Sequence, residues 1–200
     1  MANAIDFYFD FSSPYGYLAA TRIDALAAQY GRTVNWHPVL LGPAFKATGN
    51  TPLVAQPLKG AYSVRDFTRT AKFMNVPFKM PAVFPISTHN AARAFYWLND
   101  FDKPRAIALA KALYRTFFAE GVDIGSPETV VAVAATCGVD GAALLAALGD
   151  QAVKDRLKAE VEASLARGVF GSPFVFVDDE PFWGNDRLEQ IEAWLKSGGW

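Results

Sequence analysis

Cysteine and histidine are scarce in this sequence of 200 residues, which has one cysteine, Cys137, and two histidines, His37 and His89. A lone cysteine forms no intrachain disulfide, and no Cys-x-x-Cys motif is present, so dithiol redox chemistry and cysteine-based metal sites are excluded. The histidines have no pattern of carboxylates beside them, and we expect no metal site. We interpret Cys137 as a small buried hydrophobic residue and His37 as a structural one.

An excess of one charge is also lacking, because 19 basic and 20 acidic residues give a net charge of −1. This balance gives no reason to expect nucleic acid or an anionic membrane as a partner. No run of about 18 uncharged apolar residues appears, so we expect no membrane span. Met1 leads almost directly into a strand-like segment, without the basic and apolar regions of a signal peptide. We therefore expect a cytoplasmic protein.

The content of 52% hydrophobic residues indicates a folded core. The first 40 residues read as strand, helix, strand. The segment Ile5–Phe11 alternates apolar and polar side chains and is rich in aromatics, which is typical of a strand. Ser13 and Pro14 then predict the start of a helix that ends at Gly31, and Thr33–Val39 predicts a second strand.

The middle of the chain changes character. Residues 43–85 are rich in proline, glycine and asparagine, with one short helix expected around Tyr62–Met74. Further helices are expected as far as Gly168, with starts marked by Ser126 and Asp150. The end returns to strands at Pro173–Val177 and Pro181–Trp183, followed by a helix over Asp186–Lys196.

This order predicts an α/β protein with a thioredoxin-like βαβ…ββα core and a large all-helical insertion. We assign residues 1–42 and 168–200 to the thioredoxin-like domain and residues 43–167 to the inserted, mostly helical domain.

The first candidate site is Ser13-Pro14-Tyr15-Gly16, at the end of the first strand and the start of the first helix. A helix N-terminus carries free N–H groups and a partial positive charge, so it stabilises a nearby anion. The Ser13 hydroxyl does not ionise usefully alone, but it is suited to donating a hydrogen bond to a thiolate supplied by another molecule. The alternative is that Ser12 or Ser13 only caps the helix.

The second candidate site is the Gly171-Ser172-Pro173-Phe174 turn. Thioredoxin-like folds place a cis-proline here, facing the first site, and the preceding peptide group pairs with a bound peptide. The alternative is a trans Pro173 that only begins the strand. The third candidate site is Gly184-Asn185-Asp186, where free N–H groups suit a carboxylate and the Asp186 side chain suits an ammonium. Capping by Asn185 is the alternative.

Three runs of sequence and the helical block carry a resemblance that covers nearly the whole chain: FDFSSPYGYL, ATGNTPLVAQPLKGAY and GVFGSPFVFVDDEPFWGNDRLEQIEAWL. Together they resemble 2-hydroxychromene-2-carboxylate isomerases. That family sits with kappa-class glutathione transferases in the DsbA-like branch of the thioredoxin superfamily. One departure is Gly16, which replaces a serine common in the Ser-Pro-Tyr-Ser forms of the motif.

The resemblance implies glutathione as cofactor, with Ser13 as the catalytic residue that contacts its sulfur. It implies further cofactor-binding residues in two parts of the chain: Asn50, Lys59, Ser172, Pro173, Gly184, Asn185 and Asp186. The substrate-binding candidates are Phe45, Lys59, His89 and Asn90.

The implied reaction converts 2-hydroxychromene-2-carboxylate, a small aromatic carboxylate, to trans-o-hydroxybenzylidenepyruvate in aromatic hydrocarbon breakdown. The family also suggests a homodimer. Two alternatives stay open: a kappa-type glutathione transferase or peroxidase, which shares the residues named above, and a non-catalytic thioredoxin-like binding module.

Overall fold

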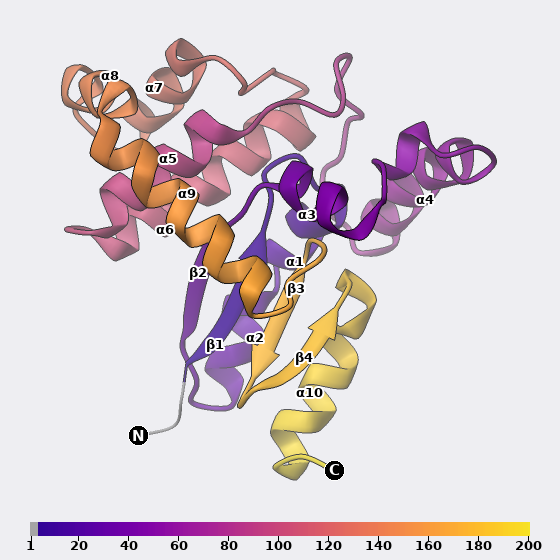
Figure 1. Ribbon diagram of the computed structural model, residues 1–200. Helices are drawn as coiled ribbons and strands as arrows, with labels where there is room; N and C mark the ends of the chain where they lie inside the picture. Colours follow the sequence, from indigo (N-terminus) through magenta and orange to yellow (C-terminus); the bar gives the residue numbers. More distant parts are fainter. Residues whose placement is uncertain (1–3) are drawn as a thin grey trace.

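Strands from the two ends of the chain lie side by side in one mixed sheet (Figure 1). The computed structural model describes residues 4–200, and the strand order in the sheet is β2-β1-β3-β4. β1 (Ile5–Phe9) pairs in parallel with β2 (Val34–Pro38) and antiparallel with β3 (Phe174–Val177). β4 (Glu180–Trp183) pairs antiparallel with β3. The predicted thioredoxin-like α/β core is therefore confirmed.

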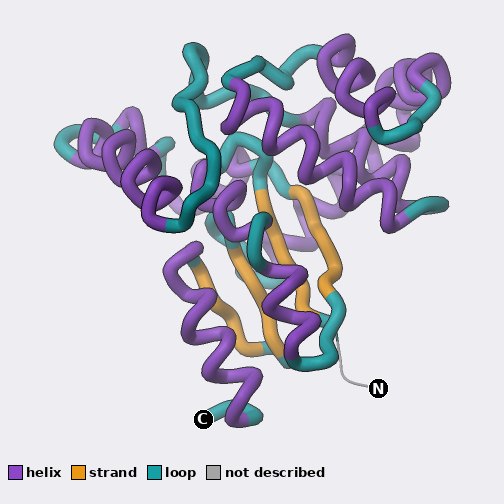
Figure 2. The backbone as a smooth tube through the Cα atoms, turned by 180° about the vertical axis from the view of Figure 1, so that it is seen from behind, coloured by secondary structure: helices purple, strands orange, loops and turns teal. Residues whose placement is uncertain are grey.

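Side chains along β1 alternate between the two faces of the sheet. Ile5, Phe7 and Phe9 are fully buried in the main core with residues of the helices α1 (Pro14–Ala20), α2 (Ile23–Gln29) and α10 (Leu188–Ser197). Tyr8 points to the opposite face, where it joins a smaller apolar cluster with Phe174. Figure 2 shows helices covering the first of these faces.

The structure corrects two of the predicted elements. β1 ends at Phe9 rather than Phe11, because the carboxylate of Asp10 accepts the N–H of Ser12 at 2.8 Å and turns the chain. The helix predicted to run from Ser13 to Gly31 is divided after Ala20. At the break, the Thr21 hydroxyl donates to the Leu18 carbonyl at 2.7 Å.

Most of the described chain between β2 and β3 is helical. A helix that the sequence pattern did not indicate, α3 (Leu41–Thr48), follows β2; its proline lies in the first turn, where proline is tolerated. The caps expected at Ser126 and Asp150 are present. The other elements of this segment are η1 (Leu53–Ala55), α4 (Lys59–Phe73), α5 (His89–Asn99), α6 (Lys103–Arg115), η2 (Thr116–Glu120), α7 (Pro127–Thr136), α8 (Gly141–Gly149) and α9 (Gln151–Ala166).

The helices of this segment form two groups that differ in their contacts. α5 packs against α6, α7, α8 and α9, whereas α4 contacts mainly η1 and, to a smaller extent, α1. In Figure 1, α4 projects to the right of the molecule, away from the α5–α9 group. No helix in residues 4–200 combines the length and the apolar character that a membrane span requires.

Candidate active site

Ser13 lies at the N-terminus of α1 and is 5% exposed. Its hydroxyl accepts the N–H of Gly16 at 3.0 Å and donates to the carbonyl of Ser172 at 2.9 Å. Ser13 therefore caps its helix and also contacts the second candidate site. The two sites predicted at opposite ends of the sequence are brought together.

The Ser172–Pro173 peptide bond is cis. The Ser172 hydroxyl accepts the N–H of Asp10 at 2.9 Å, and the Pro173 carbonyl accepts the N–H of Gly184 at 3.0 Å. The turn before β3 is thus fixed both to the end of β1 and to the end of β4.

The third candidate site has a different geometry from the cap that its sequence suggests. Gly184 has a φ of 120°, and Asn185 begins a short 3-10 helix, η3 (Asn185–Arg187), without capping it. Asn185 is 6% exposed, its amide N–H donates to the Met74 sulfur at 3.4 Å, and its Oδ1 is buried with no hydrogen-bond partner among the described residues. The Asp186 side chain is 71% exposed, with one oxygen 3.3 Å from Arg187.

The candidates in the segment that leads from α3 to α4 are more exposed. Phe45 is half-buried on α3, whereas Asn50 is exposed and its amide donates to the Thr48 hydroxyl at 3.0 Å. Lys59 is exposed at the start of α4. No hydrogen bond or ion pair in the described part of the chain joins these three side chains to Ser13.

The start of α5 carries the last two candidates. His89 lies with its Nδ1 2.8 Å from the Ser87 hydroxyl, and burial, followed by the charge of Arg93, lowers the pKa of His89. Asn90 is 8% exposed and donates to the Gly125 carbonyl at 2.9 Å. The preceding segment reaches the first site, because the Ile86 N–H donates to the Ser12 hydroxyl at 3.1 Å.

Comparisons with known proteins show the family to which the chain belongs. The family model described as a DSBA-like thioredoxin domain matches residues 4–196. A 2-hydroxychromene-2-carboxylate isomerase of Sphingobium xenophagum is 33% identical over 98% of this chain and 99% of that protein. The chain belongs to this isomerase family, within the DSBA-like thioredoxin domain family.

Two further proteins are similar to this chain over nearly its full length. A solved structure of a 2-hydroxychromene-2-carboxylate isomerase superposes with a TM-score of 0.87 at 31% identity, covering 97% of this chain and 95% of that one. The glutathione S-transferase kappa 1 of Caenorhabditis elegans is 27% identical over 96% of this chain and 90% of that protein. The kappa-class relation of this isomerase family is thus confirmed for the chain.

Gly16, the departure from the Ser-Pro-Tyr-Ser form of the family motif, has a structural cause. A Cβ at this position would lie 2.5 Å from the Tyr114 hydroxyl and 2.8 Å from the Ser172 hydroxyl. Tyr114 is 1% exposed and donates to the Asp10 carbonyl at 2.8 Å. The absence of a side chain at Gly16 therefore makes room for the contacts that hold the Ser172 turn beside α1.

Asp10 and Tyr15 make contacts around this candidate site that the sequence pattern did not indicate. Asp10 is 4% exposed and contacts several segments around Ser13. Tyr15 donates to the Asp66 carboxylate at 2.5 Å and packs edge-on against Phe67, with ring centroids 5.0 Å apart. These contacts join α1 to α4. No local signal indicated Asp10, because an acidic residue between two aromatics is ordinarily a solvent-facing position in a strand.

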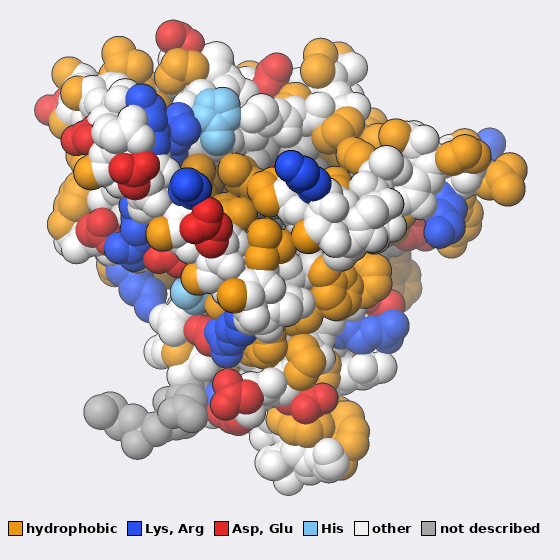
Figure 3. Space-filling model, viewed as in Figure 1, with side chains coloured by type: hydrophobic (Ala, Val, Ile, Leu, Met, Phe, Trp, Pro, Cys, Tyr) orange, Lys and Arg blue, Asp and Glu red, His pale blue; other side chains and the backbone are white. Residues whose placement is uncertain are grey.

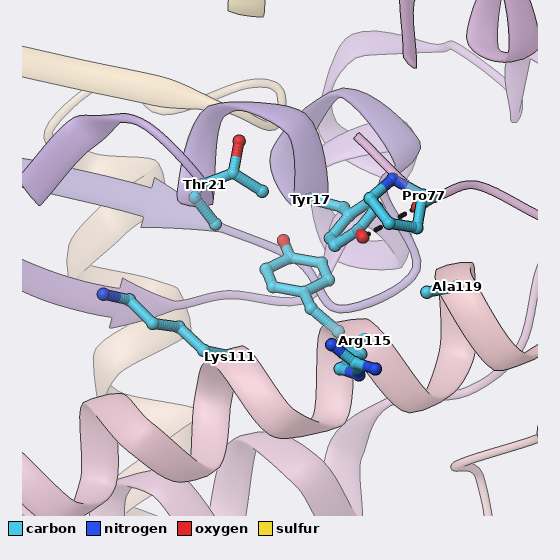
Figure 4. Close-up of a pocket in the computed structure, with 8 residues that line it drawn as sticks. Tyr17, Thr21, Pro77, Lys111, Arg115 and Ala119 are labelled. Carbon is cyan, nitrogen blue, oxygen red and sulfur yellow. Dashed lines mark hydrogen bonds between the residues drawn. The ribbon is translucent and has the colours of Figure 1, made fainter. Parts of the chain in front are cut away.

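A cavity of about 240 Å³ lies beside α1 and α6, away from the predicted site residues (Figure 4). Its two cations are paired, Lys111 with Asp24 at 2.5 Å and Arg115 with Glu120 at 3.2 Å. The lining consists of Tyr17, Ala20, Thr21, Pro77, Lys111, Tyr114, Arg115 and Ala119. None of the predicted site residues lies in this lining. By contrast, hydrophobic side chains gather over α3 and α4 on the face shown in Figure 3.

Proposed function

We propose that this chain is a glutathione-dependent isomerase that converts 2-hydroxychromene-2-carboxylate to trans-o-hydroxybenzylidenepyruvate. The observation that carries the proposal is the Ser13 hydroxyl, held at the N-terminus of α1 and 2.9 Å from the carbonyl before cis-Pro173. An isomerase of the same family is similar to this chain over nearly its full length.

The residues present fit glutathione. Asn185 Oδ1 is a buried acceptor without a donor among the described residues, and such a group is costly unless a ligand or water supplies the missing hydrogen. An ammonium donor of a γ-glutamyl group would satisfy it, and the exposed carboxylate of Asp186 lies next in the chain. Gly184, Asn185 and Asp186 would thus hold the γ-glutamyl end, and Ser172 with Pro173 the cysteinyl unit.

Bound glutathione would supply a thiolate that adds reversibly to the conjugated substrate, permits rotation about a carbon–carbon bond, and leaves. Ser13 would donate its hydroxyl hydrogen to this sulfur instead of to Ser172. A free thiol has a pKa of roughly 8.5, and lowering it by about one unit corresponds to about 1.4 kcal/mol. A charge-assisted hydrogen bond and a helix N-terminus together supply a free energy of this size.

The aromatic carboxylate would bind next to this thiol. Lys59 would hold its carboxylate and Phe45 would form an aromatic wall, with Asn50 lining the boundary between cofactor and substrate. His89 and Asn90 would border the other side. Because Asn90 already donates to Gly125, it would contribute by fixing the loop as well as by contact.

The test is an assay of the purified protein with 2-hydroxychromene-2-carboxylate, with and without glutathione. We expect isomerisation that saturates with glutathione and is lost in its absence. A kappa-type transferase, suggested by the similarity to the kappa enzyme, would instead conjugate a chlorinated nitrobenzene. No turnover of either substrate, with calorimetry showing peptide binding but no glutathione binding, would leave a non-catalytic binding module.

We further propose a cytoplasmic homodimer. A reducing cytoplasm keeps glutathione as the free thiol that the reaction requires. Cell fractionation and sedimentation of the purified protein test the two parts separately. Export of the protein would contradict the first, and a monomer at assay concentration would contradict the second.

A further inference from the structure

A buried carboxylate lies where three helices begin. Asp10 Oδ1 accepts the N–H of Ser12 at 2.8 Å and the hydroxyl of Thr88 at 2.7 Å. Its Oδ2 accepts the N–H of Leu41 at 2.7 Å. Ser12 directly precedes the N-cap of α1, Thr88 is the N-cap of α5, and Leu41 is the first residue of α3. One side chain thus meets the starts of α1, α3 and α5.

The helix starts that reach Asp10 lack caps of their own in two of the three cases. Neither Leu40, the N-cap of α3, nor Thr88 makes a side-chain capping bond within its own helix. Asp10 accepts the N–H of Leu41 in α3. It also accepts the hydroxyl hydrogen of Thr88, and the Thr88 side chain makes no capping bond to α5. The carboxylate therefore caps α3 and is hydrogen-bonded to the residues that lead into α1 and α5, although these three helix starts are distant in sequence.

No Lys or Arg side chain pairs with Asp10 in residues 4–200. Burial raises the pKa of Asp10, and the hydrogen bonds from Ser12, Leu41 and Thr88 offset only part of this effect. A carboxylate without a cation needs another source of positive potential, and helix N-termini provide it. The convergence of three such termini explains why an acidic residue is tolerated in the core at this position.

The main chain of Asp10 contacts the two sides of the site. Its N–H donates to the Ser172 hydroxyl at 2.9 Å, and its carbonyl accepts the N–H of Ser13 at 2.9 Å and the Tyr114 hydroxyl at 2.8 Å. A shift of Asp10 would therefore move Ser13 and Ser172 relative to each other.

We propose that Asp10 is the positioning residue of the site, whose carboxylate and main chain hold α1, α3, α5 and the Ser172 turn in one arrangement. The proposal rests on the proposed function, because the arrangement matters as a binding site for glutathione. It assigns to Asp10 no contact with the reacting atoms. It also connects the thiol side of the site to α3 and α5, which carry the predicted substrate contacts Phe45 and His89.

Asp10→Asn tests the proposal. The amide oxygen can still accept from Ser12 and Thr88, but the amide nitrogen then faces the N–H of Leu41, and two donors repel. A buried donor left without an acceptor destabilises the start of α3, so we expect hydrogen exchange there to accelerate about tenfold and the Kd for glutathione to rise about tenfold. Exchange is measured without glutathione, and the Kd by calorimetry.

Two further variants separate positioning from general destabilisation. Thr88→Val removes a single donor and keeps the carboxylate, and we expect faster exchange at the start of α5 with a Kd about threefold higher. Asp6→Asn is the matched control, because Asp6 lies on β1, away from the starts of α1, α3 and α5, and pairs with Arg167 at 2.7 Å. It should leave exchange in α3 and the Kd unchanged.

The outcomes are distinct. A folded Asp10→Asn protein with wild-type exchange in α3, or with altered exchange and a wild-type Kd, would overturn the proposal. If Asp10→Asn does not fold, Thr88→Val decides by the same two readouts. If the wild-type protein binds no glutathione, the proposed function fails, and loss of the exchange effect alone would then overturn the role of Asp10.

Discussion

The proposed site has two sides that differ in exposure. On the first side, Ser13 and Ser172 are hydrogen-bonded to each other. On the second side, which we propose is bordered by Asn50 and Lys59, both of these side chains are exposed. On the first side Ser13 is buried and Ser172 is half-buried, and their hydrogen bonds are close to 3 Å long. The second side is the segment with α3 and α4, and α4 is joined to α1 through Tyr15 and Asp66. In Figure 1, α1 and α3 lie near the centre of the molecule, and α4 forms an arm that projects away from it.

This difference in exposure fits the different tasks that we propose for the two sides, which are stabilising a thiolate and binding the aromatic substrate. Stabilising a thiolate requires donors fixed before the reaction, since reorganisation during the reaction would cost free energy. Binding an aromatic carboxylate allows adjustment, and exposed side chains on a weakly packed helix can provide it. The first side should therefore be intolerant of small changes in volume, and the second side should tolerate substitution with effects mainly on KM.

Gly16→Ala should have the largest effect. The added methyl group would meet the Tyr114 and Ser172 hydroxyls, so overpacking should lower the free energy of unfolding by about 1–3 kcal/mol. A displacement of about 1 Å at the site should lower kcat/KM about a hundredfold. Denaturant unfolding and steady-state kinetics measure the two effects. Gly16→Ala combined with Tyr114→Phe should recover part of the stability, and a fully active Gly16→Ala protein would show that the first side is not rigid.

Lys59→Ala should have a smaller effect, confined to the substrate. Loss of a hydrogen bond to a charged group should raise the KM for the aromatic carboxylate about tenfold. The free energy of unfolding should change by less than about 0.5 kcal/mol, because the side chain is exposed. Lys46→Ala, an exposed lysine on α3, is the matched control. Equal KM values for the two variants would remove Lys59 from the site.

Tyr15→Phe should weaken the attachment of α4 to α1 and leave the contacts of Ser13 and Ser172 unchanged. The substitution removes the hydrogen bond to Asp66 and keeps the ring against Phe67. We expect hydrogen exchange in α4 to accelerate about threefold to tenfold, with a matching small rise in KM and an unchanged kcat. Unchanged exchange in α4 would show that other contacts hold the arm.

The smallest effect at physiological pH should be the dependence of the stability of α4 on the ionisation of Asp66. Burial raises the pKa of Asp66, but hydrogen bonds from Tyr15 and Arg69 outweigh it, so the pKa is lowered from 3.8. The stability contributed by this carboxylate is therefore present above pH 3.8 and is lost as the pH falls through the folded-state pKa. Exchange in α4 measured between neutral and acid pH should show this loss in the wild type and a weaker loss in Tyr15→Phe.

The order of elements and the pairing of Ser13 with the Ser172-Pro173 turn could be predicted from the sequence. The order of elements depends on local signals: alternation along β1, the Ser-Pro helix start and the Pro before an aromatic strand. The pairing joins residues 159 positions apart, and its prediction depends on where thioredoxin-like folds place a cis-proline. Asp10 could not be predicted, because its partners Leu41 and Thr88 are 31 and 78 residues away. An acidic residue between Phe9 and Phe11 is ordinarily a solvent-facing position in a strand.

Asn185 illustrates the same limit at the other end of the chain. Its sequence context is typical of a helix cap, but its amide donates to the sulfur of Met74, the residue that follows α4 and lies 111 positions earlier in the chain. The division of the chain into residues 1–42 with 168–200 and an inserted 43–167 stays a prediction. Limited proteolysis at the two connections would test whether the helical part separates.

The most direct measurement is the pKa of the glutathione thiol when bound, titrated by thiolate absorbance in the wild type and in Ser13→Ala. We predict a wild-type pKa at least about one unit below 8.5, and a rise of about one unit in Ser13→Ala. Ser12→Ala removes the neighbouring hydroxyl, which accepts from Ile86, and should leave this pKa unchanged. The same thiol pKa in wild type and Ser13→Ala would contradict the role of Ser13 as the donor to the thiolate.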